Sequence, residues 1–232
     1  MKDEIKIKSC IICGSSDFEL MFLSKDRMFD LPGEFNVKKC SKCSLVFLDP
    51  QPGRKLLKKH YPSLNYYSYY RSKKRGSFEI LREYLFEHYY SPNAFSLVIS
   101  TFIQNVPAIP SYVKNGKVLD VGCGDGDTLS ELKKLGWETF GLDIDSQAVE
   151  TARKRGINAK LGTFREISKY PDNYFDAIRL YHVIEHIDNP SGCLSLIRKK
   201  LKREGELLIG TPNMKSIVAF LFKSYWYNLD TP

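Results

Sequence analysis

The sequence predicts an α/β protein in which a doubly wound parallel sheet follows a small, metal-stabilised module. Three observations lead to this fold class. From residue 115 onward, short apolar runs alternate with amphipathic stretches; a glycine-rich turn follows the first run; and two C-x-x-C pairs lie within the first 50 residues. A chain of 232 residues, 43% of them hydrophobic, can bury a core. We expect three regions, at residues 1–50, 51–114 and 115–232.

The longest uninterrupted apolar run, Ile217 to Phe222, is far shorter than the ~20 residues that a membrane-spanning helix needs. The first residues are charged and lack the apolar segment of a secretory signal. These features predict a cytoplasmic protein without a membrane span.

Positive charge is concentrated in the first half of the chain. Residues 1–114 contain 18 Lys and Arg against 11 Asp and Glu, whereas residues 115–232 contain 17 against 16. A basic half favours phosphate-bearing partners, such as nucleic acid or a nucleotide-linked substrate. A merely soluble basic surface is an equally good interpretation.

Four of the six cysteines form two C-x-x-C knuckles, at Cys10, Cys13, Cys40 and Cys43. In a cytoplasmic protein this spacing is typical of a structural zinc site, in which four thiolates surround the ion tetrahedrally. Residues 18–22, 35–37 and 45–48 are strand-like, and Gly14 permits the left-handed turn that a knuckle often needs. The pattern predicts a zinc ribbon that the metal stabilises. A redox pair and free cysteines are the alternatives.

Tyrosine and basic side chains are interleaved between residues 61 and 75. Such a stretch can stack on bases or sugars and bind phosphates, or it can be a linker whose tyrosines pack on the next domain. Apolar residues at helical spacing then predict one helix over 78–90 and a second over about 94–106, which end before Pro92 and Pro107.

Beyond residue 114 the pattern predicts five strands. They are expected at Lys117–Val121, Trp137–Ile144, Asn158–Leu161, Phe175–Tyr181 and Glu206–Gly210. Helices are expected after the first strand, after a cap at Asp145 or Ser146, and after the Asn189 cap, where Leu194, Ile197 and Leu201 form the predicted buried face. A further helix is expected at about 216–225.

The turn after the first strand has the form G-x-G-x-G, at Gly122, Gly124 and Gly126, and Asp120 precedes it within the strand. Glycine lets a ligand approach the backbone closely. A dinucleotide site would instead have G-x-G-x-x-G and would place a pyrophosphate on the helix N-terminus. A carboxylate at Asp120 suits a cationic, amino-bearing ligand, and Asp143, at the tip of the second strand, can accept both hydroxyls of a ribose.

These residues resemble class I S-adenosylmethionine-dependent methyltransferases, which have a Rossmann-like fold. The resemblance rests on four motifs in the family's order, between about Gly116 and Asn213. They are VLDVGCGDG at 118–126, GLDID at 141–145, FDAI at 175–178 leading to VIEHI at 183–187, and LLIGTPN at 207–213. The zinc-knuckle N-terminus followed by this domain is similar to a subgroup associated with sugars and surface polysaccharides.

The resemblance implies S-adenosylmethionine as cofactor and a role for eight residues in binding it. Asp120 would orient the methionine ammonium, Gly122, Cys123 and Gly124 would lie against the methionine and ribose, Asp143 would bind the ribose hydroxyls, and Ile144 would pack on the adenine. After the third strand the family often has an acidic residue near the adenine amine. Here Thr163 and Phe164 occupy that place, which leaves adenine recognition to Phe164 or to the backbone.

To transfer a methyl group from a sulfonium, an enzyme needs mainly to hold the two reactants in line. A hydroxyl or carbon acceptor must also lose a proton. His182 is the predicted general base because imidazole titrates near neutral pH, and Tyr181 is the second candidate. The sequence His182 to His186 also reads as H-x-x-E-H, an inverted zinc-peptidase motif, which would require a helix at this position. Glu185 and His186 are better explained as anchors of the loop than as catalytic residues.

The family's common form continues with two more strands, so the domain is expected to be incomplete after the fifth strand. The favoured function is methyl transfer to a small molecule, a sugar or a nucleotide-linked sugar. The alternatives are a methyltransferase acting on ribosomal or transfer RNA through the zinc ribbon, and a non-catalytic zinc-ribbon binding protein. The tyrosine-rich basic stretch is expected to help form the acceptor site rather than to bind RNA.

Overall fold

The computed structural model describes residues 4–27, 33–53, 77–102, 109–226 and 229. The chain divides into two compact units. One comprises residues 1–66 together with 212–232, and the other comprises residues 67–211. The tyrosine-rich basic stretch at 61–75 lies outside the described residues, as does the end of the second predicted helix.

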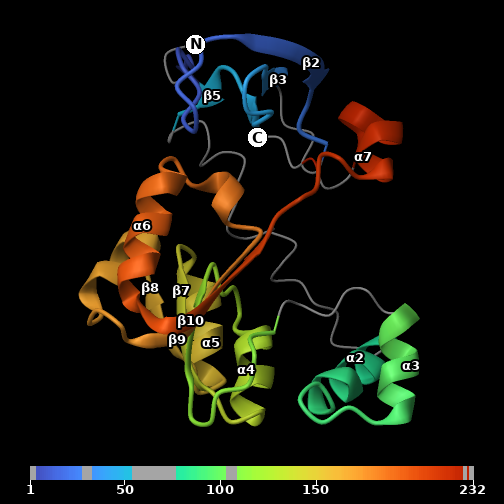
Figure 1. Ribbon diagram of the computed structural model, residues 1–232, viewed down its shortest axis with the longest axis vertical. Coiled ribbons are helices and arrows are strands. Elements are labelled where there is room, and N and C mark those ends of the chain that lie inside the picture. Colours follow the sequence, from blue (N-terminus) through green and yellow to red (C-terminus); the bar gives the residue numbers. More distant parts are fainter. Residues whose placement is uncertain (1–3, 28–32, 54–76, 103–108, 227–228, 230–232) are drawn as a thin grey trace. The chain divides into compact units, whose positions relative to one another are not determined.

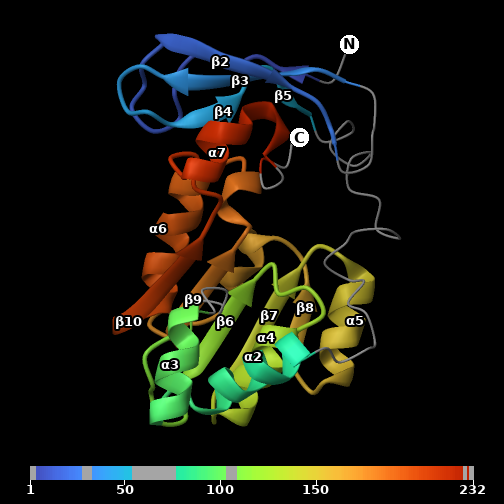
Figure 2. The ribbon, with the colours of Figure 1, turned by 90° about the vertical axis from the view of Figure 1, so that its right-hand side faces the viewer.

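The first unit contains a three-stranded antiparallel sheet in the order β2-β3-β4 (β2 and β3 are labelled in Figure 1, and all three strands in Figure 2). Its strands are β2 (Phe18–Ser24), β3 (Phe35–Cys40) and β4 (Val46–Leu48). The short strands β1 (Glu4–Ile5) and β5 (Gln51–Pro52) pair separately. The strand-like segments expected on either side of the second cysteine knuckle are therefore confirmed as strands.

The same unit contains α7 (Ile217–Phe222) and the 3-10 turn η4 (Lys223–Tyr225). Ser216 caps α7, because its hydroxyl accepts a hydrogen bond from the N–H of Ala219 at 3.1 Å. The guanidinium of Arg27 lies 3.9 Å from the ring centroid of Tyr225 and donates to the carbonyl of Ser224. These contacts join the C-terminal segment to the end of β2.

The second unit is built on a five-stranded parallel sheet in the order β10-β9-β6-β7-β8, which confirms the predicted fold class (Figure 2). The strands are β6 (Lys117–Val121), β7 (Glu138–Asp143), β8 (Asn158–Leu161), β9 (Phe175–Tyr181) and β10 (Leu201–Gly210). Because β6 lies at the centre and the order reverses there, the carboxyl ends of β6, β7 and β9 meet at the edge where such sheets bind ligands.

Helices cover both faces of this sheet. They are α2 (Ser77–Glu87), α3 (Ala94–Phe102), α4 (Asp127–Lys134), α5 (Ser146–Lys154) and α6 (Pro190–Lys200), with the 3-10 helices η2 (Phe164–Lys169) and η3 (Ile184–His186). Leu119 and Leu142 pack with Ile197 of α6 on one face, while Val118 packs with Leu129 of α4 and Val149 of α5 on the other. Alternation along β6 thus assigns Asp120 to the face that α4 and α5 cover.

The observed buried face of α6 differs from the predicted one, and Leu201 lies after the helix, at the start of β10. In α6 the buried residues are Cys193, Ile197 and Lys200, whereas Leu194 is 36% exposed, so the prediction for Leu194 was wrong. Cys193 is completely buried with Ile197 in the hydrophobic core, so this smaller side chain, and not that of Leu194, faces the sheet. In α2, Leu85 and Phe86 are buried. Among the described residues, the structure has no helix that is both long enough and apolar enough to cross a membrane.

Candidate functional site

The glycine loop after β6 is shaped by three left-handed residues, with φ values of 75° at Gly122, 54° at Gly124 and 77° at Gly126. A Cβ atom added to Gly122 would collide with Val183, and one added to Gly126 would lie 2.9 Å from the Cβ of Ala152. A Cβ added to Gly124 would meet nothing within 4 Å. Packing therefore explains two of the glycines, while the backbone at Gly124 faces open space that a ligand could occupy.

Asp143, at the carboxyl end of β7, is tied to this loop. Its Oδ2 accepts a hydrogen bond from the N–H of Gly124 at 2.8 Å, and its Oδ1 accepts one from the N–H of Asp145 at 2.9 Å. The side chain is buried, and burial raises the pKa of the carboxyl while the backbone N–H groups oppose that rise. Each carboxylate oxygen has a second lone pair, so both can still accept from a hydroxyl.

The residues predicted to surround an adenine differ in exposure. Ile144 is 71% exposed beside Asp143, which leaves its side chain available to a flat ligand. Thr163 caps η2 by accepting a hydrogen bond from the N–H of Arg165. The structure places Phe164 in the hydrophobic core at 9% exposure, so its ring packs mainly on protein.

Asp120 is buried and paired with Arg179, a residue that the sequence reasoning missed. The Nη1 of Arg179 lies 2.7 Å from the Oδ2 of Asp120. Burial raises the pKa of Asp120 to about 6, Arg179 opposes that rise, and the negative charge of Asp143 adds to it. A signal was present in the sequence, because Arg179 interrupts the otherwise apolar second half of the strand Phe175–Tyr181.

Cys123 lies within the glycine loop, but its side chain turns toward the sheet. A Cβ added to Gly141 of β7 would lie 2.6 Å from the Sγ of Cys123. Burial raises the pKa of this thiol well above its usual range, so it is protonated at neutral pH. A contribution of Cys123 to ligand binding would come from its backbone.

Tyr181 and His182 lie at the carboxyl end of β9. The ring of Tyr181, 42% exposed, covers Gly210 of β10, where a Cβ would collide with it. His182 has a φ of 56°, an uncommon conformation for a residue other than glycine, and its N–H donates to the carbonyl of Gly210 at 2.8 Å. Its Nδ1 lies 3.4 Å from Oε1 of Glu185. The arrangement presents an imidazole beside a carboxylate at the ligand-binding edge of the sheet.

The segment 182–186 does not form the helix that a peptidase motif requires. His182 follows directly from β9, and only Ile184–His186 form a short 3-10 turn. The interpretation of these residues as a zinc-peptidase site is therefore set aside.

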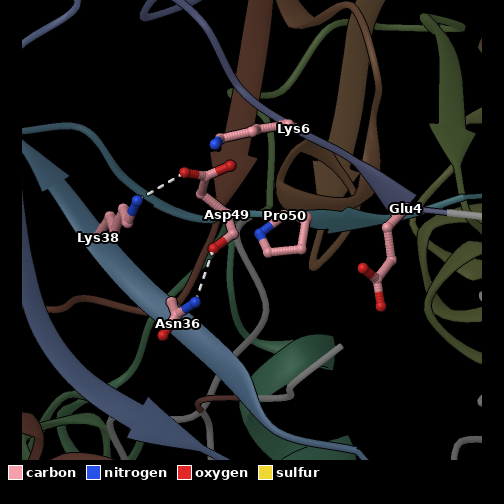
Figure 3. Close-up of a pocket in the computed structure, with 6 residues that line it drawn as sticks. All are labelled: Glu4, Lys6, Asn36, Lys38, Asp49 and Pro50. Carbon is pink, nitrogen blue, oxygen red and sulfur yellow. Dashed lines mark hydrogen bonds and ion pairs between the residues drawn. The ribbon is translucent and has the colours of Figure 1, made fainter. Parts of the chain in front are cut away.

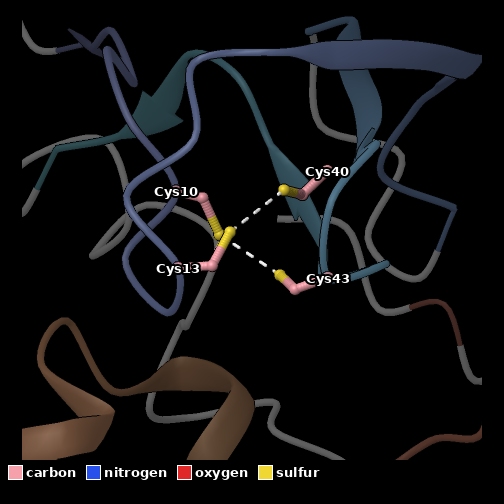
Figure 4. A group of neighbouring side chains, drawn as sticks. All are labelled: Cys10, Cys13, Cys40 and Cys43. Atoms are coloured by element: carbon pink, nitrogen blue, oxygen red, sulfur yellow. Dashed lines mark hydrogen bonds between the residues drawn. The ribbon is translucent and has the colours of Figure 1, made fainter.

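The four cysteines of the knuckles converge on one point (Figure 4). Sγ atoms lie 3.5 Å apart in the pairs Cys10–Cys43 and Cys13–Cys40, and all four lie within 4.8 Å of one another. Tetrahedral zinc with Zn–S bonds of about 2.3 Å separates its sulfur ligands by about 3.8 Å, so the cluster fits that ion. In the described part of the chain this is the one group of cysteine, histidine and carboxylate side chains close enough to hold a metal ion.

The two knuckles have the same backbone. The N–H of Gly14 donates to the carbonyl of Cys10, and the N–H of Ser44 donates to the carbonyl of Cys40, both at 2.9 Å. Gly14 and Ser44 are both left-handed, with φ values of 73° and 63°. The backbone N–H of Cys43 lowers the pKa of Cys40 to about 7. Turns of this kind direct N–H groups at the sulfurs, which favours thiolates.

A pocket in the same unit surrounds Asp49 (Figure 3). Its Oδ2 pairs with Lys38 at 2.7 Å, its Oδ1 accepts from the N–H of Ile7 at 2.9 Å, and its carbonyl accepts from Asn36 at 3.1 Å. These contacts join the segment after β1 to β3 and to the segment before β5. We assign Asp49 a structural role, because its ion pair and hydrogen bonds hold three segments of the unit together.

The sequence profile of a family described as "Methyltransferase domain" matches residues 92–231. The chain belongs to this family. The matched range includes the whole parallel sheet, the glycine loop and the carboxyl end of β9, so the methyltransferase domain contains each of the cofactor and catalytic candidates described above.

Curated relatives of this methyltransferase domain include two ubiquinone biosynthesis O-methyltransferases. The protein from Xanthomonas oryzae pv. oryzae is 27% identical over 103 residues, which are 42% of this chain and 43% of that protein. The mitochondrial protein from Schizosaccharomyces pombe is 30% identical over 103 residues, 41% of this chain and 37% of that protein. The chain thus spans less than half of the length of these relatives.

The solved structure of a SAM-dependent methyltransferase from Archaeoglobus fulgidus is 27% identical to this chain. The similarity covers 60% of this chain and 62% of that one, with a TM-score of 0.44.

Proposed function

We propose that the protein is an S-adenosylmethionine-dependent methyltransferase that acts on an oxygen of a small molecule. The observation that carries the proposal is the bond between Asp143 and Gly124. It places an acceptor with spare lone pairs next to a stretch of backbone that no side chain covers, at the ligand-binding edge of the sheet. Family membership and the names of the O-methyltransferase relatives support the same reaction class.

The cofactor would be held by residues of the glycine loop and of β7. Asp143 would accept hydrogen bonds from the ribose hydroxyls, Gly124 would let the ligand lie against the backbone, and the exposed side chain of Ile144 would cover the adenine. S-adenosylmethionine supplies a methyl group on a positively charged sulfur, which is already a good leaving group.

His182 would take the proton from the acceptor hydroxyl. Its imidazole is 48% exposed at the end of β9, and Glu185 lies close enough to orient the ring and to stabilise its protonated form. The left-handed backbone of His182 is held by its bond to Gly210, which is the kind of strained position that often marks a functional residue. Tyr181 is the second candidate, since its hydroxyl belongs to an exposed ring beside the imidazole.

For the acceptor we propose a sugar, or a sugar linked to a nucleotide. The basic first half of the chain supports a phosphate-bearing substrate, and the combination of cysteine knuckles with a methyltransferase domain is similar to a sugar-associated subgroup. We further propose that the cysteine cluster holds one structural zinc ion, because four thiols fill the tetrahedron and leave no position for a catalytic water.

Transfer of a labelled methyl group from S-adenosylmethionine tests the proposal when nucleotide sugars and total RNA are offered in parallel. Labelling of a nucleotide sugar, with little dependence on salt, is the expected result. Labelling of RNA alone, with an affinity that falls steeply between 50 and 200 mM salt, would replace the small molecule by RNA as substrate. Absence of cofactor binding in calorimetry would leave the protein as a non-catalytic module.

A further inference from the structure

Gly210, the last residue of β10, lies beside Tyr181, the last residue of β9, in the register of the parallel sheet. A Cβ atom on Gly210 would lie 2.6 Å from Cε2 of Tyr181 and closer still to Cδ2. A real Cβ atom essentially never comes within 3.0 Å of such a neighbour. The tyrosine ring therefore occupies the place of the side chain that Gly210 lacks.

The backbone conformation does not explain a glycine at this position. Gly210 is not among the glycines with a positive φ, so alanine could adopt its backbone conformation without strain. A glycine within a strand lowers the stability of that strand and often marks a place where another group approaches the backbone closely. At Gly210 the group that approaches is the ring of Tyr181.

The carbonyl of Gly210 fixes the residue that follows the tyrosine. It accepts a hydrogen bond from the N–H of His182 at 2.8 Å, where the chain leaves β9 in a left-handed conformation with a φ of 56°. The imidazole of His182 lies edge-on to the ring of Tyr181, with the ring centroids 4.8 Å apart and the ring planes at 90°. Gly210 thus acts on both candidates for the general base, on one through its missing side chain and on the other through its carbonyl.

The segment from Tyr181 to Val183 is fixed at its other end by a second glycine. The Cγ2 atom of Val183 fills the space in which a Cβ atom on Gly122 would lie. Val183 also packs against the hydrophobic core of the sheet. Because the segment is held by β10 at one end and by the glycine loop at the other, a displaced Tyr181 ring cannot carry the whole segment with it. The ring would instead move relative to the imidazole that it contacts.

We propose that Gly210 is a positioning residue for proton transfer, because it holds the ring of Tyr181 and the backbone of His182 in the places that bring the imidazole next to Glu185. The inference rests on the function proposed above and adds to it a residue of β10 that acts through Tyr181 and His182. A general base must lie within hydrogen-bond reach of the proton that it takes, so a displacement of ~1 Å is enough to slow the transfer. The cofactor site, at Asp143 and Gly124, should be unaffected.

Gly210→Ala in the full chain tests the inference, since it adds one methyl group and keeps the carbonyl. The NMR signal of the Cε1 proton of His182, assigned by its absence in His182→Asn, should shift. Transfer of labelled methyl groups to nucleotide sugars should slow by at least about tenfold. The affinity for S-adenosylhomocysteine, measured by calorimetry, should change by less than about twofold.

Gly205→Ala is the matched control. It adds the same methyl group to the same strand, at 3.1 Å from Cδ2 of Leu201 and from the carbonyl oxygens of Lys202 and Phe175. These atoms lie outside the segment from Tyr181 to Val183, so the variant should change stability but neither the His182 signal nor the rate.

A double variant separates positioning from a general loss of stability. In Gly210→Ala with Tyr181→Ala the added methyl group has room, so the His182 signal and the rate should equal those of Tyr181→Ala alone. If Gly210→Ala does not fold, the double variant should fold, because the collision with the ring is gone. Unfolding that Tyr181→Ala does not relieve would contradict the inference.

A full rate of transfer in folded Gly210→Ala, an unshifted His182 signal, or effects of the two substitutions that simply add would each overturn the inference and leave the proposed function standing. If the parent protein labels neither nucleotide sugars nor RNA, the proposed function fails. The His182 signals of the single and double variants then still decide whether Gly210 positions the imidazole.

Discussion

The carboxylate of Asp143 accepts a hydrogen bond from the backbone N–H of Gly124 at 2.8 Å, across 19 residues of sequence. This bond fixes the glycine loop of β6 against the tip of β7. Because Asp143 also accepts from the N–H of Asp145, the next residues of the chain are held in the turn that leads into α5. One side chain thus organises both loops of the proposed cofactor site before any ligand binds.

Two substitutions of Asp143 separate its structural role from its binding role. Asp143→Asn keeps one oxygen, which can accept from the N–H of Gly124, but its NH2 group cannot accept from the N–H of Asp145 and the charge is lost. It should weaken S-adenosylhomocysteine binding by ~1–2 kcal/mol and lower the melting temperature by less than Asp143→Ala does. Asp143→Ala also frees the loop and should cost ~2–3 kcal/mol in binding and some stability. Asp172→Asn is the control, since that exposed carboxylate pairs with Lys200 near the amino end of β9. Unchanged affinity in a folded Asp143→Ala protein would remove Asp143 from the site.

The proposed zinc site gives a prediction about stoichiometry. Protein purified without added zinc should contain about one equivalent of zinc, and Cys40→Ser, which removes a fully buried ligand, should lose the metal and the folded structure around β2, β3 and β4. Cys193→Ala removes a buried thiol of the other unit and should keep the full equivalent. Elemental analysis and thermal unfolding with and without a chelator measure both effects. Zinc well below one equivalent in the parent protein would contradict the assignment.

The sequence predicted the backbone of this protein better than its polar interior. Strand β6 is observed at the expected bounds, and the N-cap of α5 is Asp145, one of the two residues proposed. Apolar runs and capping residues determine these features locally, which is why they can be read from spacing. The same reasoning located Asp120, Asp143 and the glycine loop at the ends of two strands.

The partners of those residues could not be derived in this way. Asp120 and Arg179 are 59 residues apart, and only the pairing of β6 with β9 brings them into register. The second left-handed knuckle residue, Ser44, was also missed, because a positive φ at a residue other than glycine follows from packing rather than from composition. Long-range register and local strain are the information that a single sequence does not contain.

The titration of Asp120 should make stability depend on pH. Its folded-state pKa of about 6 lies above the ordinary value of 3.8, so the folded protein binds a proton more readily than the unfolded chain does. Protonation of Asp120 therefore stabilises the folded state fully below about pH 4. This contribution, on the order of 3 kcal/mol, is lost as pH rises through 6. Asp120→Asn lacks this titration, so the difference in free energy of unfolding between parent and variant should change across that range. A difference that is constant with pH would contradict the raised pKa.

The proposed base gives a prediction that concerns rate and not binding. His182→Asn removes the imidazole and keeps a residue that tolerates the left-handed backbone, so the fold and the cofactor affinity should be unchanged. The rate of methyl transfer to an oxygen acceptor should fall by ~100-fold or more, because general base catalysis typically raises a reaction rate by about 10²–10⁴-fold.

Glu185→Gln should give a smaller decrease in rate. The imidazole ring of His182 would remain, but its orientation and its protonated form would be less favoured. Stopped-time assays measure both rates. If His182→Asn keeps full activity while Tyr181→Phe abolishes it, the tyrosine replaces the histidine as the base.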